Sequence, residues 1–269
     1  MPKDERGGFA TNWEVGGTGA RKALMIHCSL ANQRAWNGIK EQLEDLATFT
    51  SFDLPGHGKS GDWVGRGEFQ EVSTAIAKDL LNGPSDLIGH SFGATVALRL
   101  ALENPGLVRS LTLIEPVYFF VAQGAVEADA HLEEYAKLVK DMRAGEKETA
   151  TREFSHLWGD GTPWEEQGEK QRASAIKRIH LILAHSPAIY EDIGGVLPEG
   201  RLEQLDIPVL LIDGAMSPPV IGVIQMRLLE RLQNAKRITV EDARHMVPIT
   251  HPVEVAVAIR NFWAEYADG

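Results

Sequence analysis

The chain has 269 residues, of which 43% are hydrophobic and 24% charged, close to the averages of globular proteins. This composition supports a sizeable core and excludes disordered, collagen-like and low-complexity chains. With 27 basic and 38 acidic residues the formal net charge is -11 and no basic patch interrupts it, so we expect neither a nucleic acid nor an anionic membrane as partner.

The chain has one cysteine, Cys28, which excludes an intramolecular disulfide and a zinc site built from cysteines. The first ten residues lack the apolar stretch of a signal peptide, and no apolar run reaches the length of a membrane span. We therefore expect a cytoplasmic enzyme. The sequence carries no signal for an oligomeric state.

Short apolar runs of β type alternate with helical patterns along most of the chain, which predicts an α/β fold with a mostly parallel sheet flanked by helices. A short edge strand is expected at Trp13–Val15, with a hairpin turn at residues 16–19. The further strands expected are Ala23–His27, Phe49–Asp53, Asp86–Gly89, Ser110–Glu115, Pro208–Asp213 and Arg237–Val240. The helices expected between or after them are Trp36–Leu46, Val72–Leu81, Ala94–Leu102, Val223–Leu232 and Val253–Trp263.

One long stretch, residues 117–200, breaks this alternation because it shows helical stripes and no convincing strand. We expect it to be a helical cap inserted after the sixth strand, with a core domain formed by residues 1–116 and 201–269. An insertion placed after a strand end tends to lie over the ligand crevice. The alternative is a small helical domain with no role in the site.

The sharpest motif is Gly89-His90-Ser91-Phe92-Gly93, which fits G-x-S-x-G between an expected strand and an expected helix. A nucleophilic serine in this setting needs a tight turn, which the two glycines permit, and a helix N-terminus that favours developing negative charge. Ser91 is therefore the candidate nucleophile. The alternative is a serine that only caps the following helix.

A serine hydroxyl is a weak nucleophile without a base, and His245 is the candidate base. It lies in a polar loop after the last expected strand and before the last expected helix. His57 and His90 are weaker candidates because they lie in a glycine-rich loop and inside the G-x-S-x-G turn. His251 is expected to open the last helix. The histidines of the insertion are expected at the surface or the edge of the core: His131, His156, His180 and His185.

These motifs together resemble the α/β-hydrolase fold superfamily, over nearly the whole chain from about Trp13 to Trp263. The resemblance is carried in chain order by four segments: residues 27–30 with Trp36 downstream, the loop Asp53–Ser60, the Ser91 turn, and His245 with His251-Pro252 after it. It implies an eight-stranded sheet and a capped serine enzyme similar to esterases or lactonases. Members that use aspartate as nucleophile, such as epoxide hydrolases and haloalkane dehalogenases, are disfavoured by Ser91.

The resemblance also implies an oxyanion hole made of backbone N–H groups. One donor should belong to Phe92, directly after the nucleophile. The other should belong to Ser29, with Leu30 as the near alternative. Family members usually have glycine where this chain has Cys28, and we expect that cysteine to be a small buried residue that fills space. Narrowing of the pocket or a redox role is the alternative.

A larger departure concerns the acid that supports the histidine. Related enzymes usually carry an aspartate where this chain has Ser217, and a serine cannot balance an imidazolium charge. Some members place the acid at the end of the strand after the nucleophile helix, where this chain has Glu115. A glutamate there is costly to bury without a partner, and a protonated His245 would be such a partner. Asp213 is the second candidate.

We therefore expect a serine hydrolase that cleaves a small-molecule carboxylic ester or lactone, without metal or cofactor. The loop Asp53–Ser60 lacks the first glycine of a phosphate-binding loop, and residues 16–19 do not open a helix as a dinucleotide site requires. The alternatives are a C–C bond hydrolase or haloperoxidase-like enzyme on the same residues, or a ligand-binding homologue with weak turnover, which Ser217 motivates. The side chains expected to form the pocket wall are Leu30, Trp36, Phe92, Phe119, Trp158 and Met246.

Overall fold

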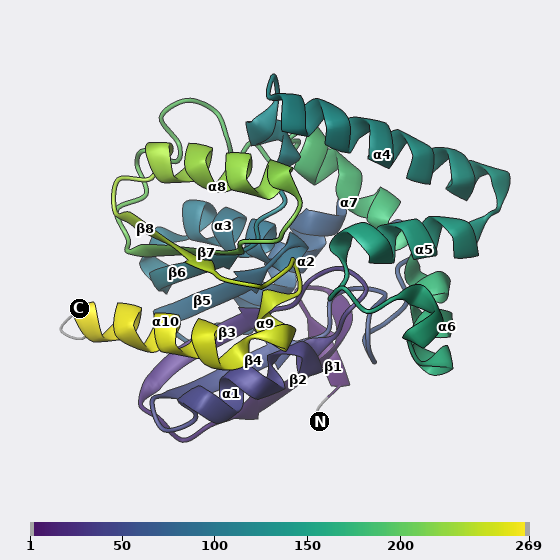
Figure 1. Ribbon diagram of the computed structural model, residues 1–269. Coiled ribbons are helices and arrows are strands. Elements are labelled where there is room, and N and C mark those ends of the chain that lie inside the picture. Colours follow the sequence, from purple (N-terminus) through teal and green to yellow (C-terminus); the bar gives the residue numbers. More distant parts are fainter. Residues whose placement is uncertain (1–2, 267–269) are drawn as a thin grey trace.

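The computed structural model describes residues 3–266, in which eight strands form one sheet in the order β1-β2-β4-β3-β5-β6-β7-β8 (Figure 1). The β1–β2 and β2–β4 pairs are antiparallel and every other pair is parallel, which confirms the mostly parallel sheet. The strands are β1 (Lys3–Arg6), β2 (Phe9–Gly16), β3 (Arg21–Ile26), β4 (Ala47–Phe52), β5 (Ser85–His90), β6 (Val108–Ile114), β7 (Val209–Gly214) and β8 (Ala235–Val240).

The antiparallel edge of the sheet differs from the expectation in two ways. The strand expected at Trp13–Val15 runs from Phe9 to Gly16 and forms a hairpin with β1, turning at Gly7 and Gly8, which both have positive φ. Residues 16–19 do not form a hairpin turn, because β2 pairs with β4 and not with β3. The polar sequence of β1 offers no alternation of apolar residues, and its main-chain pairing with β2 makes it a strand.

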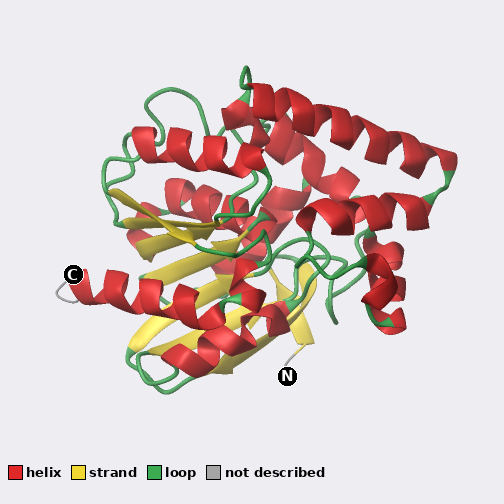
Figure 2. Ribbon diagram, viewed as in Figure 1, coloured by secondary structure: helices red, strands yellow, loops and turns green. Residues whose placement is uncertain are grey.

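Helices cover both faces of the sheet (Figure 2). Side chains of successive strand residues point to opposite faces. In β5 and β6, for example, Leu87 and Leu113 join the core on one face, whereas Ile88 and Ile114 join the core on the other. The first core is covered by α2 (Phe69–Asp79), α3 (Phe92–Glu103) and α8 (Pro219–Arg231), and the second by α1 (Asn37–Leu43) and α10 (Pro252–Glu265).

Between β6 and β7 the chain forms helices and no strand, as the sequence predicts. This helical insertion extends beyond the strands on one side of the molecule (Figure 1). Its helices are α4 (Val126–Ala144), α5 (Lys147–Trp158), α6 (Glu169–Arg178) and α7 (Leu181–Tyr190). Short 3-10 turns lie at η1 (Gln33–Trp36), η2 (Pro105–Leu107), η3 (Phe119–Ala122) and η4 (Trp164–Glu166), and α9 spans Val247–Thr250.

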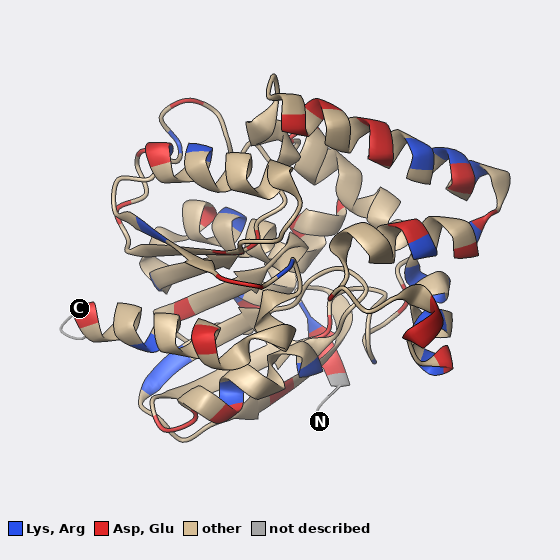
Figure 3. Cartoon of the chain, viewed as in Figure 1, with Lys and Arg blue, Asp and Glu red and all other residues tan. Residues whose placement is uncertain are grey.

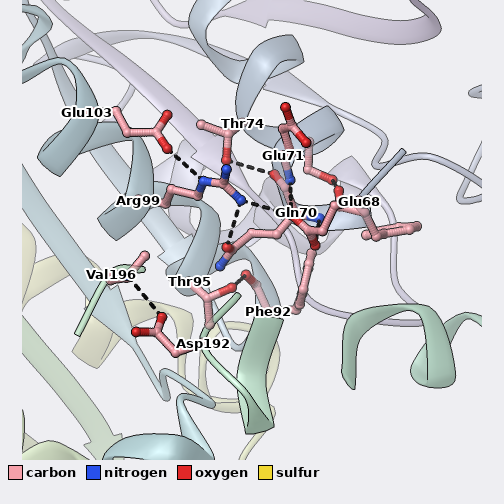
Figure 4. Close-up of polar contacts among 12 residues, drawn as sticks. Glu68, Gln70, Glu71, Thr74, Phe92, Thr95, Arg99, Glu103, Asp192 and Val196 are labelled. Carbon is pink, nitrogen blue, oxygen red and sulfur yellow. Dashed lines mark hydrogen bonds and ion pairs between the residues drawn. The ribbon is translucent and has the colours of Figure 1, made fainter. Parts of the chain in front are cut away.

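Helix α3 is fixed against α2 by polar groups around Arg99 (Figure 4). The Arg99 guanidinium donates to the carboxylates of Glu68 and Glu103, each at 2.8 Å. The Gln70 amide donates to the hydroxyl of Tyr118 at 2.9 Å, and that hydroxyl donates to a backbone carbonyl of α3 at 3.1 Å. Because Arg99 and Glu68 are both largely buried, these bonds restrain the helix whose first residue follows Ser91.

Candidate active site

Ser91 lies on a tight turn between β5 and α3, as the sequence predicts. Its φ of 55° is in the left-handed region, which a non-glycine residue adopts only under constraint. The flanking glycines allow this turn. A Cβ on Gly93 would lie 2.1 Å from the Ile26 carbonyl oxygen, and one on Gly89 would lie 2.4 Å from the Gly93 carbonyl oxygen. The turn therefore packs backbone directly against backbone and aims the Ser91 side chain off the sheet edge.

The register of the sheet brings Ser91 and Glu115 to the same edge. His90 pairs with Ile114 across β5 and β6. The residues that follow them, Ser91 and Glu115, therefore lie next to each other where the strands end. His245 reaches them from the loop between β8 and α9. Nε2 of His245 lies 3.0 Å from Oγ of Ser91, and its Nδ1 lies 2.8 Å from Oε2 of Glu115. All three residues are buried.

The carboxylate of Glu115 has three hydrogen-bond partners, which compensates for its complete burial. Oε2 faces His245, and Oε1 accepts from the backbone N–H of Gly214 and from the hydroxyl of Ser217, both at 2.7 Å. Ser217, which stands where related enzymes usually have the acid, thus contacts the glutamate instead. Asp213 is elsewhere, in a two-pronged ion pair with Arg237 at 2.8 Å for both contacts.

His90 holds the loop of His245 in place. Its Nε2 lies 2.8 Å from the backbone carbonyl oxygen of His245, to which it donates. Burial, together with the neighbouring His245, lowers the pKa of His90 well below its ordinary value, so its ring is neutral. A neutral ring with its proton on Nε2 is the form that this carbonyl requires. No pattern in the sequence indicates this contact.

Among the described residues, the backbone N–H groups of Ser29 and Phe92 form no hydrogen bond and are free to donate to a ligand. Both residues line the pocket that contains Ser91. The N–H of Leu30 does not join them, because it donates to Nε2 of His57 at 3.0 Å. Burial and, to a lesser extent, the neighbouring His27 and His185 lower the pKa of His57 well below its ordinary value. The His57 ring is therefore neutral and its Nε2 can accept this hydrogen bond.

The pocket beside Ser91 encloses a cavity of about 60 Å³ with mostly apolar and aromatic walls. Phe92, Phe119 and Trp158 line it, as the sequence predicts. The indole of Trp158 stands edge-on to the ring of His245, with centroids 4.7 Å apart. His131 and His185 also line the pocket, whereas we expected them at the surface or the edge of the core. Both lie on helices of the insertion, and the helix packing that turns them towards the pocket leaves no motif in the sequence.

Three residues expected in the pocket wall lie elsewhere. Trp36 is completely buried in the core between the sheet and α1, where it packs edge-on to His90. An aromatic residue in a helical stripe more often belongs to the core than to a pocket wall. Leu30 and Met246 line a neighbouring surface groove instead.

Cys28 is buried outside the pocket, and burial raises the pKa of its thiol to about 12, which makes it an unreactive, space-filling residue.

Residues 3–266 contain no group of three His, Cys, Asp or Glu side chains close enough to hold a metal ion. None of the helices described has both the length and the apolar character needed to span a membrane.

The chain matches the model of the "Alpha/beta hydrolase family" over residues 23–258. It therefore belongs to that family and is a hydrolase. A pimeloyl-[acyl-carrier protein] methyl ester esterase of Methylococcus capsulatus is 30% identical, with 93% of this chain and 97% of that protein covered. An (E)-2-((N-methylformamido)methylene)succinate hydrolase of Acinetobacter baylyi is 25% identical, with 90% of this chain and 89% of that protein covered.

Solved structures agree on the fold. The crystal structure of a putative lipase from Acinetobacter baumannii superposes with a TM-score of 0.79 at 18% identity, covering 98% of this chain and 90% of that one. At an identity this low, the superposition supports the architecture alone and gives no information on the substrate.

Proposed function

We propose that the protein is a serine hydrolase that cleaves a carboxylic ester through an acyl-enzyme intermediate, with Ser91 as nucleophile, His245 as base and Glu115 as acid. The observation that carries the proposal is the unbroken line of hydrogen bonds from Ser91 through His245 to Glu115, at the wall of an apolar pocket. Nucleophile, base and orienting acid within hydrogen-bond distance are the elements that acyl transfer needs.

The first half of the reaction forms the acyl-enzyme. Glu115 accepts the Nδ1–H of His245, which leaves the lone pair on Nε2 free to take the Ser91 proton. Oγ of Ser91 then attacks the ester carbonyl carbon, and the carbonyl oxygen becomes an oxyanion. The N–H groups of Ser29 and Phe92 bind this oxyanion, and one such donor is worth about 3–4 kcal/mol.

The second half releases the products. His245, now protonated, gives its proton to the leaving alcohol oxygen as the tetrahedral intermediate collapses. A water molecule next loses a proton to His245 and attacks the acyl carbonyl, and the returned proton restores the Ser91 hydroxyl. Throughout, the negative charge of Glu115 stabilises the imidazolium, while Gly214 and Ser217 hold the carboxylate in place.

Residues 117–200 form the cap in this proposal. Most of the pocket wall comes from this segment, including Phe119, Trp158 and Ile189, whereas Ser91 and His245 come from the two flanking parts of the chain. The small volume and aromatic wall of the pocket favour an apolar acyl or alcohol group, open-chain or cyclic as in a lactone. The esterase and hydrolase names of the relatives support ester cleavage.

The proposal is tested by labelling the purified protein with a fluorophosphonate, which reacts only with an activated serine, and mapping the adduct by mass spectrometry. We expect labelling at Ser91 that Ser91→Ala abolishes. Ser174→Ala, which removes a hydroxyl on α6, is the matched control and should label like the wild type. A folded protein that stays unlabelled, or labelling that survives Ser91→Ala, would contradict the proposal.

A further inference from the structure

Two buried ring nitrogens at the pocket have no hydrogen-bond partner among the described residues: Nδ1 of His131 and Nε2 of His185. Buried polar atoms without partners are rare in native proteins and call for an explanation. His185 stacks on Phe92, with ring centroids 4.0 Å apart, and faces Ser29 with its other nitrogen, so it belongs to the reaction end of the pocket. Nothing in the proposed reaction uses His131.

The ring of His131 is held by aromatic neighbours and by a hydrogen bond of its Nε2. It stacks on Phe119 with centroids 3.9 Å apart, and Trp158 stands edge-on at 5.4 Å. Because Trp158 also contacts His245, one indole ring separates His131 from the catalytic residues. Only 7% of the His131 side chain is exposed, so bulk water does not satisfy its free nitrogen. A ring held this firmly presents the nitrogen at a defined place.

The partner of the other nitrogen decides what His131 offers. Nε2 lies 2.7 Å from the hydroxyl of Tyr190, whose single partner among the described residues is His131. If the tyrosine donates, both the phenolic proton and Nε2 are satisfied, and the ring proton sits on Nδ1. If His131 donated instead, the buried phenolic proton would have no acceptor. The first arrangement is favoured, so Nδ1 carries a proton with nothing to receive it.

The charges around this donor indicate the kind of acceptor that fits. Burial lowers the pKa of His131 to about 4, so the ring is neutral at ordinary pH. The carboxylate of Glu134 lies 4.0 Å from Nδ1, too far for a hydrogen bond, and Glu153 also lines the pocket. The described lining includes no lysine or arginine. Lys137 lies outside this lining and already pairs with Glu153. A substrate carboxylate would therefore meet the negative charge of Glu134 and no lysine or arginine of the lining, whereas an uncharged oxygen meets no such penalty.

We propose that the Nδ1–H of His131 binds the substrate, and that the pocket selects esters carrying an uncharged oxygen acceptor, such as an ether or ketone oxygen, in the arm that fills it. This inference rests on the proposed ester hydrolysis. Tyr190 is a positioning residue here, because its hydroxyl keeps the His131 proton on Nδ1. The apolar wall then provides affinity for the substrate, and the single N–H donor provides selectivity among substrates, as is common in small-molecule pockets.

The test compares ester pairs of equal length in which one CH₂ group is replaced by oxygen at successive positions. One series varies the acyl chain and the other varies the alcohol. The readout is the ratio of kcat/KM for each ether to that of its all-carbon partner. At the best position we expect His131→Phe to lower this ratio about three- to tenfold, the value of one hydrogen bond. A purely structural loss would lower both rates and leave the ratio unchanged.

Three further variants test whether the N–H donor of His131 causes the preference for the ether. His131→Gln retains an N–H donor and should restore part of the preference, whereas Tyr190→Phe should weaken it. Leu157→Met changes an apolar wall residue of the same pocket and should not alter the ratio. Equal ratios in wild type, His131→Phe and Tyr190→Phe at every position of both series would overturn the inference.

Failure of the proposed function is distinguished by a binding measurement. Ester pairs are titrated calorimetrically into Ser91→Ala, which leaves the ligands intact, and into the same variant combined with His131→Phe. An ether preference that disappears in the double variant supports the subsite even if no ester is hydrolysed. Hydrolysis and Ser91 labelling without any ether preference would overturn the subsite alone.

Discussion

At the scale of single residues, Glu115 is the group on which the proposed chemistry depends most. We expect Glu115→Gln to lower kcat by about 10³–10⁴-fold, because a neutral amide neither fixes the His245 tautomer nor stabilises its charged form. Asp213→Asn is the matched control: it breaks the ion pair to Arg237 and should alter stability while changing kcat little. Steady-state kinetics with thermal unfolding of each variant checks this, and the reverse ranking of the two effects on kcat would exclude Glu115 as the acid.

The residues of the site divide into those that local sequence can predict and those that it cannot. The pattern around Ser91 is local. Glu115 could be predicted as the acid because a charged residue at the end of an apolar strand needs a partner. The contact of Ser217 with Glu115 joins residues 102 positions apart, so no local pattern indicates it. The expectation that Trp36 lines the pocket is wrong, because a helical stripe does not tell which layer its aromatic residue faces.

At the scale of elements, the close contact between α3 and the end of β3 makes the elbow intolerant of added atoms. A Cβ on Gly93 would lie 2.1 Å and 2.5 Å from the carbonyl oxygens of Ile26 and His27. We expect Gly93→Ala to destabilise the protein by about 1–3 kcal/mol and to lower kcat, because the helix must move and carries the Phe92 N–H with it. Urea unfolding and ester kinetics measure the two effects.

A second glycine provides the control for that experiment. Gly222 lies within α8, where an added Cβ meets nothing within 4 Å. Because alanine is the better helix former, Gly222→Ala should leave kcat unchanged and stabilise the protein by up to about 1 kcal/mol. Equal destabilisation by the two substitutions would show that crowding at the elbow is not the cause.

The elements themselves could be predicted where hydrophobic periodicity was strong. The buried strands β5 to β7 and the helices between strands appear where the apolar patterns place them. The edge strand β1 escaped prediction, because KDER has no apolar side chain to place and is held by main-chain pairing. The supposed hairpin at residues 16–19 failed because glycines mark a turn without revealing which strand the chain joins next.

At the scale of the whole molecule, most charged side chains lie at the surface, and each of the four carboxylates buried among the described residues has hydrogen-bond partners: Asp53, Asp86, Glu115 and Asp213. Charged residues are carried mainly by helices and loops, and the central strands show few of them (Figure 3). The buried titratable side chains of residues 3–266 include six histidines and four carboxylates. Burial lowers the pKa of five of these histidines: His27, His57, His90, His131 and His185. These five histidines are therefore neutral rings in the folded protein.

This makes the stability of the whole fold depend on pH in a definite direction. Burial, with a smaller effect of His27, lowers the pKa of His185 to about 3, whereas in the unfolded chain it titrates near 6.5. Between these values the unfolded state binds the proton and the folded state does not, so the stabilisation present above pH 6.5 is lost as the pH falls towards 3. We expect the free energy of unfolding, measured in urea, to decrease from pH 6 to pH 5.

The contribution of one histidine can be isolated from that slope. His185→Gln removes a group that gains a proton only on unfolding, so the decrease between pH 6 and pH 5 should be shallower than in the wild type by about 1 kcal/mol. Because the readout is a slope, it does not depend on how far the substitution lowers stability at neutral pH. Carboxylates titrate mainly below this window and add little to the difference. Identical slopes would mean that His185 takes up a proton in the folded protein and that its buried ring is not held neutral.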